Sequence, residues 1–167
     1  QSAELIPGLP PVFTTLEVNR LENNIGYIRF DPFAPALTAP LLDAIHEMEN
    51  APGLIIDLRG NHGGNSDVGK RLIDAMVDQA HLIWTWTTRH GTGATYAEPS
   101  ADPYDGLVVV LVDVCSGSAS EAFAGGMQAM AEGRLGMYHM LAADKGSAEP
   151  PLAAAVAWFE SKGVHNV

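Results

Sequence analysis

The sequence predicts an α/β fold with a largely parallel central sheet, and three observations support this prediction. Two short apolar runs, at residues 54–58 and 107–112, are bounded by turn-forming residues, which is typical of strands buried on both faces. Each run is followed by a Gly- or Ser-rich loop. Apolar residues at helical spacing follow each loop, and strands that alternate with helices in this way usually lie parallel in one sheet.

The amino-terminal part of the chain predicts a hairpin followed by a helix. Residues 1–11 contain three prolines and are expected to form a strap or linker. Residues 12–20 and 25–30 are rich in β-favouring side chains, and Asn23-Asn24 between them tolerate the positive φ angles of a tight turn. A helix is expected to begin near Thr38.

The rest of the chain predicts three more helices and two less regular strands. One helix is expected to be capped by Ser66 or Asp67, and the next follows the Ser-rich loop. Leu82, Trp84 and Trp86 are predicted to share one strand face, which favours packing in the core or between subunits. The remaining predicted elements are a strand at residues 81–88, an exposed loop at 89–105, a strand at 135–141 and a final helix at 152–159.

Composition indicates a globular chain and excludes several classes of partner. Of the 167 residues, 47% are hydrophobic and 17% charged, which predicts one folded domain over residues 12–167. The net charge of −11 argues against nucleic acid or an anionic membrane as a partner, and no apolar run approaches the roughly 20 residues of a membrane span. The single cysteine, Cys115, and the spacing of the six histidines predict no metal site and no cofactor.

Two loops could carry chemistry, because each follows the carboxyl end of a buried strand, where α/β sheets place their sites. Adjacent glycines in residues 60–64 let main-chain N–H groups approach a ligand closely, and a serine in residues 116–121 begins a helix, where the free N–H groups favour negative charge. Asp57 and Asp113 end the two strands and are expected to orient the loops by hydrogen bonds. Taken alone, either loop is ordinary turn or cap chemistry.

Together, the two loops and their strands resemble the S41 serine peptidases, the tail-specific or C-terminal processing proteases. The resemblance runs from about residue 25 to 134, through the opening strand at 25–30, the Gly-Gly strand motif at 53–64 and the serine helix at 116–128. It implies a crotonase-like (ClpP/crotonase) ββα superhelix in a single domain. It also implies an extracytoplasmic location, periplasmic or secreted, in a bacterium.

The same resemblance assigns the reacting groups. It implies that Ser118 is the nucleophile, and that main-chain N–H groups of Gly63, Gly64 and Ala119 form the oxyanion hole. Protein or peptide substrates are implied, and a homo-oligomer is left open.

The general base has two candidates. Lys145 stands where the family has its lysine, and Glu149 stands where the family has a glutamine. A lysine acts as a base only when its pKa falls from about 10.4 toward neutrality, and a nearby carboxylate opposes that fall. His62, beside the Gly-Gly pair, is the other candidate, since some relatives of the family use histidine.

Three functions are therefore weighed. The leading hypothesis is a serine endopeptidase. The alternative is a catalytically inactive binding protein for a peptide or an apolar ligand, because the segment around Lys145 departs from the family pattern. The third is an acyl-CoA enzyme of the crotonase type, against which the net charge of −11 and the lack of a basic cluster argue.

Overall fold

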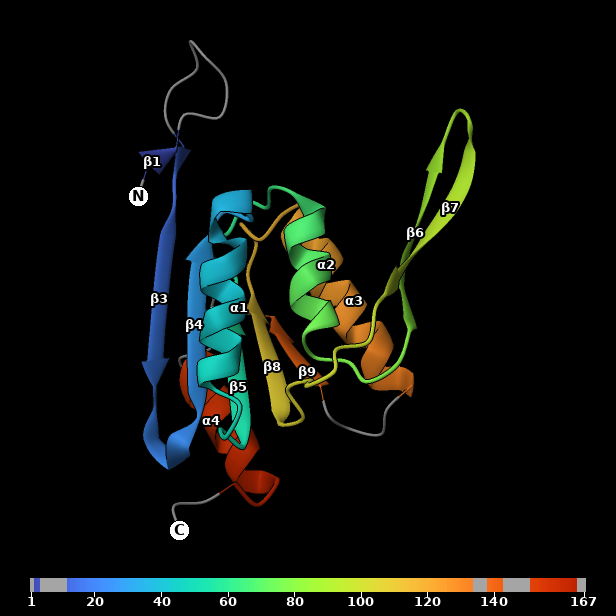
Figure 1. Cartoon of the computed structure of the whole chain (residues 1–167). Helices are drawn as coiled ribbons and strands as arrows, with labels where there is room; N and C mark the ends of the chain where they lie inside the picture. Colours follow the sequence, from blue (N-terminus) through green and yellow to red (C-terminus); the bar gives the residue numbers. More distant parts are fainter. Residues whose placement is uncertain (1, 4–11, 134–137, 143–150, 165–167) are drawn as a thin grey trace.

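The computed structural model describes residues 2–3, 12–133, 138–142 and 151–164. A five-stranded sheet forms its centre, in the order β3-β4-β5-β8-β9 (Figure 1). β3 runs antiparallel to β4, whereas every other neighbouring pair is parallel, so the predicted sheet is confirmed. The strands are β3 (Thr15–Arg20), β4 (Gly26–Asp31), β5 (Gly53–Asp57), β8 (Leu107–Val112) and β9 (Tyr138–Ala142).

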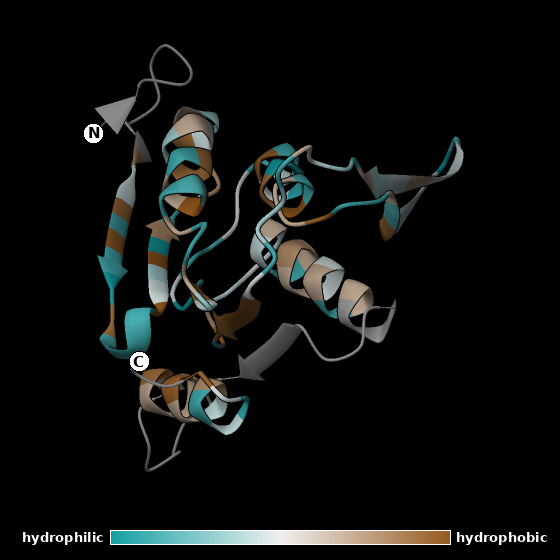
Figure 2. Cartoon of the chain, turned by 60° about the horizontal axis from the view of Figure 1, so that its bottom comes forward, coloured by the Kyte–Doolittle hydropathy of each residue, from teal (hydrophilic) through white to brown (hydrophobic). Residues whose placement is uncertain are grey.

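Helices cover both faces of the sheet, so its central strands are buried on both sides. In β5, Leu54 and Ile56 belong to one hydrophobic core, whereas Ile55 lies in a second core with Phe159 of α4. Figure 2 shows α4 on one side of the sheet and the other helices on the opposite side. The helices are α1 (Thr38–Glu47), α2 (Ser66–Asp74), α3 (Ala119–Gly133) and α4 (Pro151–Ser161).

The predicted loop at residues 89–105 is wrong at residues 91–97, because β7 (Gly91–Ala97) pairs antiparallel with β6 (His81–Thr88). Two glycines in β7 weaken its strand signal, and the pairing with β6 supplies the missing hydrogen bonds. A register shift at Ile83 places Leu82 opposite Tyr96, on the face of the hairpin away from Trp84 and Trp86. The predicted common face of Leu82 with the tryptophans is therefore also wrong.

The amino-terminal elements differ from the prediction only in detail. The first predicted strand is divided into β2 (Val12–Phe13) and β3, and β2 pairs with β1 (Ser2–Ala3). The tight turn at Asn23-Asn24 is confirmed by φ angles of 61° and 57°, within a short 3₁₀ turn, η1 (Glu22–Asn24). A second 3₁₀ turn, η2 (Pro35–Leu37), leads into α1.

The cap of α2 lies one residue earlier than predicted. Asn65 is the N-cap, since its side chain accepts a hydrogen bond from the Asp67 N–H group at 2.8 Å. Of the predicted strand at 135–141, residues 138–141 belong to β9, and residues 135–137 lie outside the described residues. The predicted final helix corresponds to α4. Among the helices of the described ranges, none combines the length and the apolar character that a membrane crossing needs.

Candidate functional site

The candidate site lies at the carboxyl ends of β5 and β8, the end of the sheet at which α2 and α3 begin (Figure 1). Residues 58–65 form the Gly-Gly loop after β5, and residues 113–118 form the serine loop after β8. In a parallel sheet these two ends are neighbours, and β5 and β8 are directly paired. The topology therefore brings the two loops together.

Main-chain contacts join the two loops directly. The Gly117 N–H group donates to the Asn61 carbonyl oxygen at 3.1 Å, and the Ser120 hydroxyl donates to the same oxygen at 2.9 Å. A methyl group at Gly63, where φ is +98°, would lie 2.8 Å from Ser118 Cβ. No residue with a side chain fits there, so the close approach of the two loops depends on glycine at position 63.

The Asn61 side chain is the buried centre of this junction, a role that was not predicted from the sequence. It is fully buried, and its Nδ2 atom donates to the Phe30 carbonyl oxygen of β4 at 2.8 Å. Its Oδ1 atom accepts from the Gly63 N–H group at 2.8 Å and lies 3.0 Å from the Ser120 hydroxyl oxygen, whose one hydrogen is shared between this atom and the Asn61 carbonyl oxygen. One amide thus joins a strand, the Gly-Gly loop and α3. A polar residue placed between glycines after a buried strand was the available signal.

Ser118 is exposed and occupies a left-handed backbone conformation, with φ at +53°. Such a conformation is uncommon outside glycine and is often found where a side chain is held for function. The Ser118 N–H group donates to Glu121 Oε2 at 2.8 Å, and the Ser118 carbonyl accepts from Ala122 at 3.0 Å. The turn into α3 is fixed by these contacts, while the Ser118 hydroxyl makes no hydrogen bond within the described residues.

Of the three main-chain N–H groups predicted to form the oxyanion hole, two donate no hydrogen bond to the described residues. The Gly63 N–H group donates to Asn61, so it is already used. Phe33 holds the chain on both sides of Gly64, through hydrogen bonds of 2.8 Å to the Gly63 carbonyl and from the Asn65 N–H group. In the part of the chain that the structure describes, the N–H groups of Gly64 and Ala119 donate to no acceptor. Both flank the contact between the two loops.

Asp113 fastens the serine loop, as predicted. Its Oδ1 atom accepts hydrogen bonds from the main-chain N–H groups of Gly60, Cys115 and Ser116 at 2.9–3.1 Å. Burial would raise the pKa of the Asp113 carboxyl, but these hydrogen bonds outweigh it and hold the pKa below its usual value. An ionised Asp113 therefore links both loops.

Asp57, at the end of β5, is fully buried and fully paired. It accepts from the Tyr27 hydroxyl at 2.8 Å and from Arg59 Nε at 2.8 Å. Burial would raise the pKa of the Asp57 carboxyl, but hydrogen bonds from Arg59 and Tyr27 outweigh it and lower the pKa. Burial, followed by the hydrogen bond to Asp57, raises the pKa of Tyr27 to about 12. The predicted orienting role of Asp57 is confirmed by its hydrogen bond from the Arg59 N–H group at 3.0 Å.

Of the two candidate bases, His62 lies in the part of the chain that the structure describes, whereas Lys145 does not. The His62 side chain is exposed, and its main-chain N–H group donates to Asp31 Oδ1 at 3.3 Å. Among the described residues, no hydrogen bond joins the His62 imidazole to Ser118. Lys145 and Glu149 lie outside the described residues.

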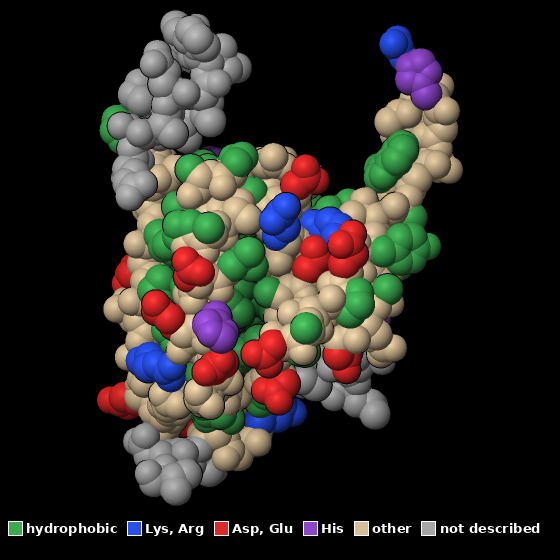
Figure 3. All heavy atoms as spheres, in the orientation of Figure 1, with side chains coloured by type: hydrophobic (Ala, Val, Ile, Leu, Met, Phe, Trp, Pro, Cys, Tyr) green, Lys and Arg blue, Asp and Glu red, His purple; other side chains and the backbone are tan. Residues whose placement is uncertain are grey.

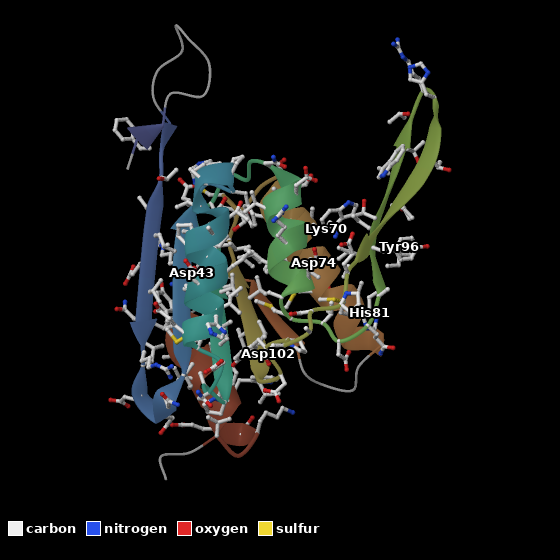
Figure 4. All side chains as sticks on the ribbon, viewed as in Figure 1. Asp43, Lys70, Asp74, His81, Tyr96 and Asp102 are labelled. Carbon is white, nitrogen blue, oxygen red and sulfur yellow. The ribbon has the colours of Figure 1, made fainter. Side chains whose placement is uncertain are left out.

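An open groove of about 580 Å³ runs along α2, but it is separate from these loops. Lys70 and Asp74 of α2 line it, on the side of α2 that faces β7 (Figure 4). Lys70 Nζ lies 2.9 Å from Asp74 Oδ2 and 3.3 Å from Glu98 Oε1. Burial would lower the pKa of Lys70, but these carboxylates outweigh it and raise the pKa. Lys70 is thus held as a paired cation and is no candidate base.

Side chains that could share a metal ion lie at the opposite end of the sheet. Within the described ranges, His46, Glu49 and Asp102 place one ligand atom each within 4.8 Å of the others. All three are exposed, and they precede β5 and β8, whereas the candidate site follows these strands. They have no part in chemistry at Ser118.

Comparisons with known proteins identify relatives of this chain. The family model described as peptidase family S41 matches residues 24–135. A carboxyl-terminal-processing protease of Synechocystis sp. is 32% identical over 122 residues, covering 72% of this chain and 28% of that protein. The carboxy-terminal processing protease CtpA of Bacillus subtilis is 30% identical over 105 residues, covering 62% of this chain and 22% of that protein. The chain therefore spans less than a third of these relatives.

Solved structures share the fold. The photosystem II D1 C-terminal processing protease superimposes with a TM-score of 0.62 at 23% identity, covering 77% of this chain and 35% of that one. A putative peptidase from Parabacteroides merdae superimposes with a TM-score of 0.62 at 22% identity, covering 75% of this chain and 42% of that one.

Proposed function

The chain belongs to peptidase family S41, and from this membership we propose that it is a serine endopeptidase that cleaves polypeptides through Ser118. The observation that carries the proposal is the contact of the two loops. Ser118 is the last residue of the serine loop, directly before α3, and the N–H groups of Gly64 and Ala119 beside it have no acceptor among the described residues. A hydroxyl next to two unpaired amides suits attack on a carbonyl group.

In the proposed mechanism, Ser118 Oγ attacks the scissile carbonyl carbon, and Lys145 accepts the hydroxyl proton. The carbonyl oxygen becomes an anion that accepts hydrogen bonds from the N–H groups of Gly64 and Ala119. Loss of one such donor typically costs about 2.7–4 kcal/mol of transition-state stabilisation. The protonated base then gives its proton to the leaving amine, and water hydrolyses the acyl-enzyme. Gly63, whose own N–H group is bound to Asn61, holds the loop in place.

The substrate and setting follow from the relatives and are part of the proposal. Two relatives are named as carboxyl-terminal processing proteases, which favours the unstructured carboxyl-terminal tails of proteins as substrates. We further propose that residues 12–167 form one core domain with the crotonase-like superhelix. An extracytoplasmic location fits this class of substrate.

A fluorophosphonate probe tests the nucleophile. The folded wild-type chain should be labelled covalently, and Ser118→Ala should lose all labelling. Ser66→Ala, which removes an exposed serine at the start of α2, is the matched control and should be labelled like the wild type. A folded wild type that is never labelled would contradict the proposal.

A second comparison separates the two bases. Lys145→Ala should abolish peptide cleavage without unfolding the chain, whereas Lys162→Ala, at an exposed position after α4, should retain it. If Lys145→Ala remains active and His62→Ala does not, His62 is the base.

A further inference from the structure

The hairpin of residues 81–97, here called the arm, stands away from the body of the molecule (Figure 1). Its root is anchored by Ile83, whose side chain is buried against α3. The contact is made at Gly126 of α3, where an added methyl group would lie only 2.4 Å from Ile83 Cγ2. Beyond the root the arm is a two-stranded sheet, and within the described residues neither outer edge is paired. Two strands alone are only marginally stable in water, so a further strand at one edge would stabilise the arm.

The β6 edge has none of the usual protection against pairing. Exposed edge strands in proteins normally carry charges or proline. Residues 82–88 contain neither and consist of Leu, Ile, Trp and Thr, most of which favour strands. β7 differs, because it contains two glycines. The β6 edge is therefore the one suited to accept another strand.

Large apolar side chains of the arm are also exposed. Trp86 is 49% exposed and Tyr96 is 54% exposed, and the register places them on opposite faces. Figure 3 shows hydrophobic side chains along the arm, and Figure 4 shows Tyr96 pointing away from the body. Trp86 covers Gly93, since a methyl group there would lie 2.1 Å from Trp86 Cζ2.

The charge distribution favours a second copy of the same chain as the partner. Of the 9 Lys and Arg and 20 Asp and Glu residues, the arm contains Arg89 alone. The body carries the whole acidic excess, so two bodies repel each other, whereas two arms do not. A strand rises about 3.3 Å per residue, so two arms that touch only through their outer halves hold the two bodies apart. The separation exceeds about 8–10 Å, the distance over which dissolved salt screens charges, so the repulsion between the bodies is weak.

We propose that the arm is a dimerisation element, in which β6 pairs antiparallel with β6 of a second copy about a two-fold axis at Trp86. In this register Trp86 lies opposite Trp86 of the partner subunit, and Thr85 lies opposite Thr87 of the partner subunit. The result is a four-stranded sheet with an aromatic pair and two threonine pairs at its centre, all of them favourable cross-strand contacts. The interface is self-complementary, as a two-fold dimer requires.

Disulfide trapping tests the register. In a Cys115→Ser background, Trp86→Cys should form a covalent dimer under mild oxidation, because opposite residues of an antiparallel pair have Cα atoms about 4.5–5.5 Å apart. Tyr96→Cys is the matched control, being similarly exposed on the same arm but on β7 and the other face. It should cross-link at least about tenfold more slowly, because the proposed pairing keeps it far from its counterpart.

Analytical ultracentrifugation of the Cys115→Ser chain over a wide range of protein concentration tests whether the dimer forms. The wild type should pass from monomer to dimer. Trp86→Lys should raise the dissociation constant by roughly tenfold or more, because it places two ammonium groups opposite each other, whereas Tyr96→Lys should not.

Three results would overturn the proposal. The chain could sediment as a monomer at every concentration, or Tyr96→Cys could cross-link as fast as Trp86→Cys. In the third result, the chain is monomeric and the amides of its arm are protected from hydrogen exchange only when an extended polypeptide is added. The last result would make the arm a polypeptide-binding edge instead. A Ser118→Ala background prevents self-cleavage, and none of these readouts needs catalysis. The proposal can therefore fail while the peptidase assignment stands.

Discussion

At the scale of single residues, the Asn61 amide determines whether the two loops keep their contact. Asn61→Ala should lower the free energy of unfolding by about 2–4 kcal/mol, because it leaves the Gly63 N–H group and the Phe30 carbonyl without a buried partner. It should also slow fluorophosphonate labelling of Ser118. Urea unfolding and the labelling rate measure the two effects.

Asn65→Ala is the control for this change. Asn65 caps α2 from an exposed position, so its loss should cost about 1 kcal/mol and leave the labelling rate unchanged. Equal labelling of the two folded variants would show that Asn61 does not position the site.

The pairing of Tyr27 with Asp57 predicts a loss of stability in alkali. The pKa of Tyr27 is raised from 10.0 to about 12 in the folded chain. Below pH 10 the hydroxyl is protonated in both states, so its contribution is complete. Between pH 10 and 12 the unfolded chain loses this proton first, and the free energy of unfolding should fall by about 2 kcal/mol. Urea titrations across this range measure the fall.

Tyr27→Phe should be less stable at pH 8 by about 1–2 kcal/mol, since Asp57 loses one of its donors. Its stability should then decline less steeply between pH 10 and 12 than that of the wild type. Parallel curves for the two proteins would assign the alkaline loss to other groups.

At the scale of loops and strands, two glycines of one loop offer a controlled comparison. Gly60 and Gly63 both have positive φ, but a methyl group at Gly60 meets nothing within 4 Å, whereas one at Gly63 would lie 2.5 Å from the Gly117 carbonyl oxygen. Both alanine variants bear backbone strain, which should cost Gly60→Ala about 1–2 kcal/mol of stability. Gly63→Ala should lose more, because its methyl group also clashes with the serine loop. Gly63→Ala alone should force the two loops apart and lower the labelling rate of Ser118 by roughly a hundredfold. Similar labelling rates would show that the close approach does not matter for reactivity.

Most helices and strands could be predicted from the sequence, because their buried positions require apolar residues in a regular pattern. Apart from Asp57, the runs at residues 54–58 and 107–112 are apolar on both faces, so β5 and β8 were unambiguous. β7 was missed because its glycines carry no side-chain signal, and its pairing with β6 depends on a neighbouring strand. The face of Leu82 was wrong because a register shift is decided by Ile83 packing on α3.

The site could be predicted less completely than the fold. The sequence brings Gly63 and Ser118 to neighbouring strand ends, and the topology alone makes them meet. Which amides stay unpaired depends on hydrogen bonds formed across the fold, such as that from Gly63 to Asn61, and no local pattern reveals them. The role of Lys145 remains a prediction.

At the scale of the whole molecule, the net charge of −11 predicts which substrates the proposed peptidase should prefer. Two unstructured peptides that differ only in carrying Lys or Glu away from the cleaved bond should be cleaved with different kcat/KM. The Lys peptide should be favoured by roughly tenfold at low ionic strength, because the acidic body attracts it. Added salt should remove the difference, since the charges involved are exposed. A ratio that salt leaves unchanged would instead indicate a direct contact.

Cys115 gives the molecule a built-in attachment point for a reporter group. It is the single thiol in the sequence, it is exposed, and it lies three residues before Ser118 in a loop tied down by Asp113. A small fluorophore coupled there needs no engineered cysteine and would sense the polarity beside Ser118, the proposed nucleophile. The arrival and departure of a polypeptide could then be followed as a change in emission, turnover by turnover.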